Sequence, residues 1–186
     1  MEKLRMISKP GEDEYPSYSK IYMELLKDDG LILHHLGENF KKIKELIYSL
    51  PEHKLYYRYA ENKWSIKEIL VHIIDDERIF AYRALRFARS DQTELPGFDE
   101  DGFTFYSDAN KRSLENIFEE YEAVRNATIA MFNGFPEEAF MRSGVGSGNK
   151  RTVRALCYHI AGHELRHIKM IKDRYLNMTL ENNNIL

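Results

Sequence analysis

Residues 65–88 read SIKEILVHIIDDERIFAYRALRFA, and this stretch decides the fold class. Ser65 and Glu68 match a capping box, in which the two side chains satisfy unpaired backbone N–H groups at the start of a helix. The apolar residues that follow recur at helical spacing: Ile66, Ile69, Leu70, Ile73, Phe80 and Leu85. The pattern therefore predicts an amphipathic helix that extends to about Ala88.

The rest of the chain shows the same periodicity in three further long segments. The predicted helices cover residues 31–49, 113–133 and 152–176, with a shorter helix over 17–28. No segment shows a competing strand pattern, and glycines 144–148 indicate a loop. The connection at 90–108 is long for a compact domain, and such loops are often functional. The sequence predicts an all-α four-helix bundle with long connections.

The bulk composition is typical of one globular domain. The chain has 186 residues, of which 43% are hydrophobic, and this is enough to bury a sizeable core. Polar residues and helix breakers near the N-terminus predict an arm at 1–16. The bundle domain is then expected at 17–178, followed by a C-terminal tail at 179–186.

Charge and cysteine content exclude several classes of protein. The net charge of −3 gives no general attraction to nucleic acid. The single cysteine, Cys157, cannot form an intramolecular disulfide, which fits a reducing compartment. The N-terminus lacks a signal-peptide pattern, and no stretch approaches the roughly 20 apolar residues of a membrane span. We expect a cytoplasmic protein with no membrane or nucleic-acid partner.

Four histidines occupy positions that favour a metal site. His159, His163 and His167 follow one another at four-residue spacing, and His72 lies on the apolar side of the helix at 65–88. Counting about 100° per residue from Ile160, His167 falls near −20° and His163 near −60°. His159 falls near −100° on the same count, largely outside the core face. We therefore expect His72, His163 and His167 to hold a divalent metal, with His159 flanking it.

A three-histidine site leaves coordination positions open, which suits catalysis better than structure. The structural alternative is a set of hydrogen-bonded core histidines, because a single inward histidine is more often a core residue than a metal ligand. Burying three imidazoles without a shared partner is costly, and a common cation removes that cost. Such a donor set accepts several divalent cations, iron and manganese among them.

Two acidic residues are candidates for roles beside the metal. Glu164, on the inner side of its helix, could orient a ligand or act as a general base. Asp76 follows His72 by four residues and could fix the tautomer of a ligand imidazole or transfer protons. The alternative for the acidic cluster at 75–77 is ion pairing on the helix surface.

The stretch from His163 to His167 also matches the H-E-x-x-H pattern of zinc proteases. The extended protease pattern requires glycine and histidine further along, where this chain has Met170 and Asp173. A protease is therefore disfavoured.

Several motifs, in this order and spacing, resemble the DinB-like superfamily, which includes the bacillithiol transferases. They are Lys63-Trp-Ser-Ile-Lys-Glu68, His72-Ile-Ile-Asp-Asp-Glu-Arg-Ile-Phe-Ala-Tyr-Arg83, Leu95-Pro-Gly-Phe-Asp99 and Gly162-His-Glu-Leu-Arg-His167. The resemblance covers about residues 30–176 and implies a DinB/YfiT-like four-helix bundle. It also implies a nickel or zinc ion held by one histidine of the second helix and two of the fourth, and a homodimer.

Three functions remain open. The leading hypothesis, which the resemblance favours, is a metal-dependent S-transferase that adds a small-molecule thiol to an electrophilic substrate, because a metal-bound thiol ionises readily. The second is a metal-dependent hydrolase that uses metal-activated water. The third is a non-enzymatic metal-binding module related to stress.

Overall fold

The computed structural model describes residues 4–177, so the predicted tail at 179–186 lies outside the described residues. Four long helices dominate it: α2 (Ile32–Tyr48), α4 (Ile66–Ala88), α6 (Leu114–Asn133) and α7 (Val153–Met170). Short α-helices lie before and between them: α1 (Lys20–Met23), α3 (Glu52–Leu55) and α5 (Glu100–Tyr106). The remaining helical turns are η1 (Glu12–Glu14), η2 (Ser17–Ser19), η3 (Ala109–Lys111), η4 (Glu137–Met141) and the π-helical η5 (Ile171–Tyr175). The predicted all-α fold is confirmed.

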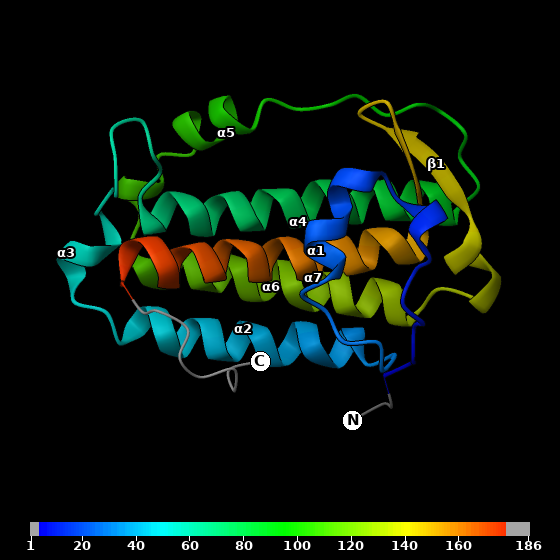
Figure 1. Ribbon diagram of the computed structural model, residues 1–186, viewed down its shortest axis with the longest axis horizontal. Coiled ribbons are helices and arrows are strands. Elements are labelled where there is room, and N and C mark those ends of the chain that lie inside the picture. Colours follow the sequence, from blue (N-terminus) through cyan, green and yellow to red (C-terminus); the bar gives the residue numbers. More distant parts are fainter. Residues whose placement is uncertain (1–3, 178–186) are drawn as a thin grey trace.

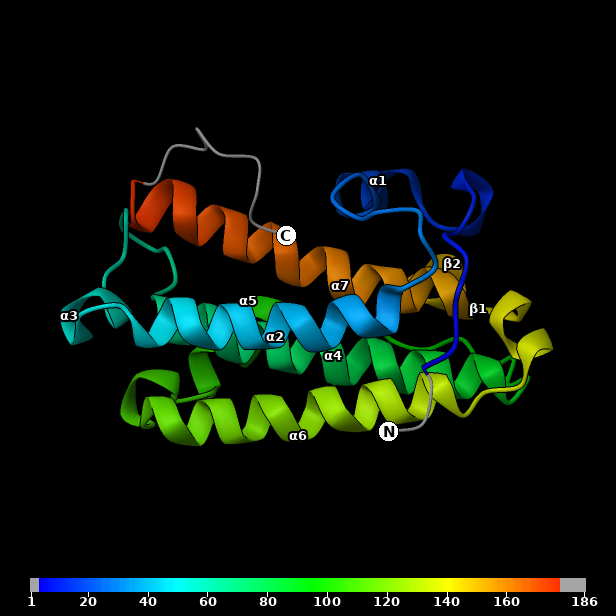
Figure 2. The same cartoon turned by 90° about the horizontal axis from the view of Figure 1, so that it is seen from below.

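The four long helices lie side by side and form a bundle (Figure 1). Helix α4 packs against α7 and α6, and α2 packs against the same two helices. As a result α4 and α2 occupy diagonally opposite corners, as do α6 and α7, which lie on opposite sides of the bundle in Figure 2. The connection that carries α5 runs along the outside of α4 (Figure 1). None of the helices between residues 4 and 177 has both the length and the apolar character needed to cross a lipid bilayer.

Side-chain caps fix where the long helices begin. The Ser65 hydroxyl accepts a hydrogen bond from the N–H of Glu68, whose carboxylate accepts one from the N–H of Ser65, so the predicted capping box is present. Ser113 and Thr152 cap α6 and α7 in the same manner, each accepting from a backbone N–H of the first turn. The predicted starts of these helices agree with the observed starts to within a residue or two.

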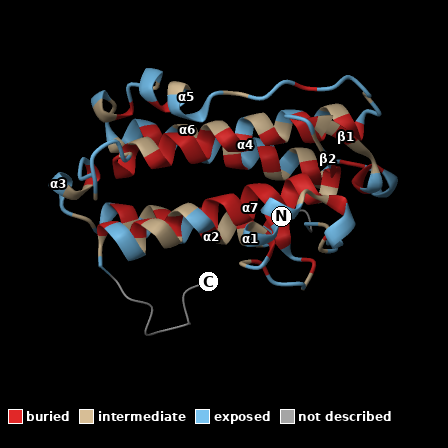
Figure 3. Ribbon diagram, turned by 45° about the horizontal axis from the view of Figure 1, so that its top comes forward, coloured by how far each residue is buried: buried red, intermediate tan, exposed pale blue. Residues whose placement is uncertain are grey.

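The faces predicted to be apolar are buried between the helices (Figure 3). Along α4 every member of the predicted stripe is buried except Leu85, which is 36% exposed. The prediction for Leu85 was wrong because its side of α4 emerges from the bundle near the helix end. At the other end of the chain, helix α7 continues into the π-helical turn η5, where Tyr175 is buried and donates a hydrogen bond to the carbonyl of Trp64.

Two predicted loops contain regular structure. The glycine-rich segment forms an antiparallel hairpin of β1 (Ser143–Gly146) and β2 (Asn149–Thr152), so the expectation of no strand was wrong. The hairpin is fixed by a distant partner, because the N–H of Leu95 donates to the carbonyl of Val145 and the N–H of Ser147 donates back to Leu95. The long connection at 90–108 therefore starts along the hairpin and then forms α5.

The segment predicted as an arm packs on the bundle where it is described. Ile7 is buried, and its carbonyl accepts a hydrogen bond of 2.7 Å from the hydroxyl of Tyr158. Glu14 is buried too, where it accepts hydrogen bonds from Thr152 and Arg154. Residues 4–16 thus help to hold the start of α7, and α1 follows directly against that helix.

Candidate metal centre

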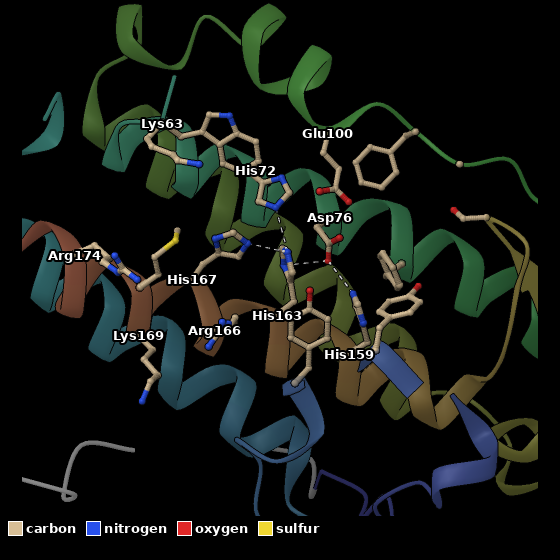
Figure 4. Close-up of a pocket in the computed structure, with 18 of the residues that line it drawn as sticks. Lys63, His72, Asp76, Glu100, His159, His163, Arg166, His167, Lys169 and Arg174 are labelled. Carbon is tan, nitrogen blue, oxygen red and sulfur yellow. Dashed lines mark hydrogen bonds and ion pairs between the residues drawn. The ribbon is translucent and has the colours of Figure 1, made fainter. Parts of the chain in front are cut away.

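The site is built on the facing surfaces of α4 and α7, which run in opposite directions (Figure 1). On α4, His72, Asp76 and Phe80 follow at four-residue spacing, so all three point to one side of the helix. On α7, the same spacing aligns His159, His163 and His167. The antiparallel arrangement brings the start of one series against the end of the other (Figure 4).

Three ring nitrogens converge at the centre of this surface. The Nε2 atom of His163 lies 3.1 Å from Nε2 of His72 and 3.0 Å from Nε2 of His167. Ligand atoms around one cation at bond lengths of about 2.1 Å are separated by roughly 3.0 to 3.4 Å in octahedral or tetrahedral geometry. These distances therefore fit a shared divalent ion. Within residues 4–177 this is the one cluster of at least three histidine, cysteine or acidic side chains that could hold a metal.

Burial keeps the three imidazoles neutral, which is the form that binds a metal. Desolvation lowers the pKa of His72 and holds the pKa of His163 well below its usual range. It also lowers the pKa of His167 to about 3. The lone pairs are therefore available near neutral pH without the release of a proton.

Asp76 lies beside the cluster, as predicted. Its Oδ2 atom is 3.2 Å from Nδ1 of His163 and 3.6 Å from Nε2 of His159. A carboxylate facing Nδ1 favours the tautomer that carries its proton there, which leaves the Nε2 lone pair of His163 directed at the metal position. Burial raises the pKa of Asp76, and the neighbouring His163 and His72 oppose that shift. The alternative of surface ion pairing is excluded for Asp76, which is buried.

His159 was predicted to lie largely outside the core face, and this was wrong. It is only 4% exposed, and its ring stacks on Phe80 with 3.8 Å between the ring centroids. Its outer side is covered by Tyr22 of α1, at a centroid distance of 5.0 Å. Gly162 makes this cover possible, because a Cβ atom there would lie 2.6 Å from the carbonyl oxygen of Tyr22. Neither ring nitrogen of His159 has a hydrogen-bond partner among the described residues.

Glu164 lies on the inner side of α7 as predicted, but away from the histidine cluster. Its Oε1 atom accepts a 2.5 Å hydrogen bond from Arg125 and another from the hydroxyl of Tyr121. Arg125 also binds the carboxylate of Glu77, so the four side chains form a closed network in the core. The predicted role of Glu164 as a base or ligand-orienting group is therefore corrected: its carboxylate holds helices together. No local pattern points to Arg125, because its partners lie on other helices.

The histidines open into a cavity of about 900 Å³. The long connection contributes Gly97, Phe98 and Glu100 to its wall. Trp64 is partly buried and packs on His72, with ring centroids 4.6 Å apart. The cavity is also lined by many cationic side chains: Lys63, Arg83, Arg151, Arg166, Lys169 and Arg174.

Comparison with known proteins identifies the family. Residues 35–171, most of the chain, match the sequence model of the DinB superfamily. The chain belongs to the DinB superfamily. A relative from Oceanobacillus iheyensis, which bears the name "Putative metal-dependent hydrolase", is 27% identical over 133 residues. The matched region spans 70% of this chain and 76% of that relative.

Among solved structures, this DinB-superfamily chain is similar to YfiT from Bacillus subtilis. The two superpose with a TM-score of 0.72 at 15% identity, over 91% of this chain and 93% of YfiT. YfiT is described as "a probable metal-dependent hydrolase with an unusual four-helix bundle topology". At this level of identity the likeness shows a shared fold, which confirms the predicted DinB-like bundle.

Proposed function

We propose that this protein is a metal-dependent enzyme that transfers a small-molecule thiol to an electrophilic substrate. The observation that carries the proposal is the convergence of three Nε2 atoms, from His72, His163 and His167, at distances that fit one divalent cation. Nickel or zinc suits these neutral nitrogen donors, and iron or manganese is an alternative. Three protein ligands leave room in the coordination sphere for a reactant.

A divalent ion at this position supplies one kind of chemistry, which is to lower the pKa of a bound thiol or water so that the nucleophile ionises near neutral pH. In the transfer reaction the thiol loses its proton and its sulfur forms a bond to the electrophilic carbon. The bond from that carbon to the leaving group breaks, and the leaving group departs with the electron pair.

The chain's own residues orient the ligands and receive the proton. Asp76 holds the proton of His163 on Nδ1, and Oδ2 of the same carboxylate lies near Nε2 of His159. Burial holds the pKa of His159 well below its usual range, so its ring stays neutral. Burial raises the pKa of Asp76, so its carboxylate is the group placed to receive a proton that leaves the reacting nucleophile. Trp64, Phe80 and Tyr22 surround the site with aromatic surface that limits the access of water.

The size of the cavity favours transfer between two molecules. A hydrolytic water takes up only about 30 Å³, whereas the cavity of about 900 Å³ is at the upper end of the range for small-molecule sites. It has space for a thiol and a second substrate side by side. Hydrolysis is the second candidate, because the Oceanobacillus relative bears the name "Putative metal-dependent hydrolase".

The proposal is tested by supplying metal-loaded protein with cysteine and a fluorogenic chloroalkyl bimane, and by detecting the thioether by fluorescence and mass spectrometry. We expect turnover above the uncatalysed rate, and loss of that turnover in His72→Ala. His34→Ala is the matched control, because His34 is exposed on α2, and it should keep wild-type activity.

The other outcomes choose between the alternatives. Thioether formation at equal rates in wild type and His72→Ala would overturn the transferase proposal. Metal-dependent cleavage in a panel of esters and amides, lost in His72→Ala and without thioether formation, would establish the hydrolase instead. Stoichiometric metal with neither activity would favour the non-enzymatic binding module.

A further inference from the structure

Two arginines are buried in the cavity wall, beyond His159 from the three metal-binding candidates. Arg83 is 3% exposed and Arg151 is 2% exposed, yet both side chains line the cavity. Arg83 follows His72 by eleven residues on the same helix, a separation of about 16 Å along the axis. Arg151 directly precedes the N-cap of α7, which places it beyond His159 in the same direction.

Neither arginine is neutralised by the protein. Arg83 donates hydrogen bonds of 2.9 Å to the carbonyl of Pro96 and 2.8 Å to the hydroxyl of Ser147. Arg151 donates to the carbonyl of Gly146 and to the hydroxyl of Tyr18. All four acceptors are uncharged, and no carboxylate of residues 4–177 forms an ion pair with either guanidinium.

Burying two cations without a counter-ion destabilises the folded protein, and the positions of these two side chains increase that destabilisation. Both guanidinium groups lie over the ring of Phe80, with the central carbons 4.9 Å and 5.5 Å from its centroid. Burial and the charge of Arg151 lower the pKa of Arg83, and the charge of Asp76, which forms no ion pair with it, opposes that shift. Arginine does not lose its proton in proteins, so the charges persist. Buried charges are normally paired, and these two lack a partner.

The surrounding backbone is shaped to hold the pair. A Cβ atom at position 146 would lie 3.1 Å from Nε of Arg83, so a larger residue there would require the arginine side chain to shift. The hairpin turn places Ser147, with a positive φ of 54°, where it accepts from Arg83. Nε of Arg151 is buried and has no hydrogen-bond partner among the described residues.

We propose that Arg83 and Arg151 form an oxyanion subsite that binds a carboxylate or phosphate group of a small-molecule substrate. The subsite lies along the cavity wall beyond His159, so a bound molecule presents its anionic group here and extends toward the metal position. This inference rests on the proposed function for the identity of the ligand as a substrate, but anion binding itself needs no metal. It defines the substrate class as anionic.

The test measures anion binding to the metal-free protein, prepared with a chelator, at constant ionic strength. Inorganic phosphate and succinate are titrated separately, and binding is followed by thermal unfolding and by the NMR signal of the Arg151 Nε–H group. We expect a saturable rise in Tm with at least one of the two anions, because a ligand that binds only the native state stabilises it. Comparison of the two anions distinguishes a phosphate group from a carboxylate.

Arg151→Met should weaken binding by about 10- to 100-fold, the scale of lost hydrogen bonds to a charged group. Arg151→Lys restores part of the affinity, and Arg89→Met, an exposed arginine just after α4, is the matched control and should bind as wild type does. The NMR titration uses wild-type protein, so it decides the matter even if a variant fails to fold. Saturation at Nε–H of Arg151 with the same dissociation constant is the expected result.

The proposal is overturned if neither anion raises Tm or shifts the Arg151 signal, or if Arg151→Met binds as tightly as wild type. Binding that disappears in His72→Ala would locate the anion at the histidines and would overturn it as well. Retention of anion binding in His72→Ala, together with no thiol transfer by metal-loaded wild-type protein, would leave the subsite standing while the proposed reaction fails.

Discussion

Asp76→Asn separates the effect of a charge on the metal from its effect on the fold. The substitution keeps the shape of the side chain and removes the negative charge 3.2 Å from Nδ1 of His163. Loss of an acidic partner of a ligand histidine typically lowers metal affinity by about 10- to 100-fold, or about 1.4 to 2.7 kcal/mol. We therefore expect a correspondingly larger metal dissociation constant, measured by competition with a chromophoric chelator.

The metal-free protein should respond in the opposite direction. Oδ2 of Asp76 is buried beside the neutral rings of His163 and His159, and a buried carboxylate without a cationic partner destabilises the fold. Metal-free Asp76→Asn is thus expected to melt at or above the wild-type temperature. Asp75→Asn is the matched control, because Asp75 pairs at 3.6 Å with the half-exposed Arg78, and its loss should leave metal affinity unchanged. Equal metal affinity in wild type and Asp76→Asn would refute the reasoning, as would a lower Tm of the metal-free variant.

Three further predictions follow from the same geometry. Metal analysis should find one ion per chain in His159→Ala and substoichiometric metal in His72→Ala, and full occupancy of the latter would disprove the ligand assignment. Arg125→Met leaves two buried carboxylates unpaired and should destabilise the fold by about 3 to 5 kcal/mol. The control Arg78→Met, at the surface, should cost at most about 1 kcal/mol. Similar denaturant midpoints for the two variants would contradict this prediction. The pKa of His167 is about 3 in the folded protein and near 6.5 in the unfolded chain, so between pH 3 and 6.5 the unfolded chain binds more protons. Metal-free protein should therefore lose stability as the pH falls from 6.5 toward 3. The fall in Tm should be shallower in His167→Gln, and identical slopes would show that this group is not responsible.

The parts of the fold that local periodicity encodes could be predicted from the sequence. The capped start of α4 is a property of that helix alone, and the spacing of His163 and His167 is a property of α7 alone. Counting residues was therefore sufficient to find both features. The assignment of His72 to the same site required only that the apolar faces of two helices meet. This is why the bundle and the three metal-binding candidates emerged together.

The missed features depend on partners far away in the chain. His159 lies off the apolar stripe of α7 and is buried only because α1 approaches at Gly162. An arginine within α6 is normally predicted to lie at the surface, but Arg125 is buried because two other helices place Glu77 and Glu164 beside it. The hairpin is held by backbone hydrogen bonds to Leu95, and no pattern within the glycine-rich segment predicts that contact.

The separation of the metal ligands along the chain has a consequence for biosynthesis. His72 and His163 are 91 positions apart, and the helix that carries His163 and His167 is the last long one to be made. While that helix is still inside the ribosome, the nascent chain exposes only one of the three expected metal ligands, His72. At translation rates of about 5 to 20 residues per second, the ligand set stays incomplete for several seconds after His72 has emerged. Metal uptake should therefore be a post-translational event, and a prematurely terminated chain would leave the metal pool of the cell untouched.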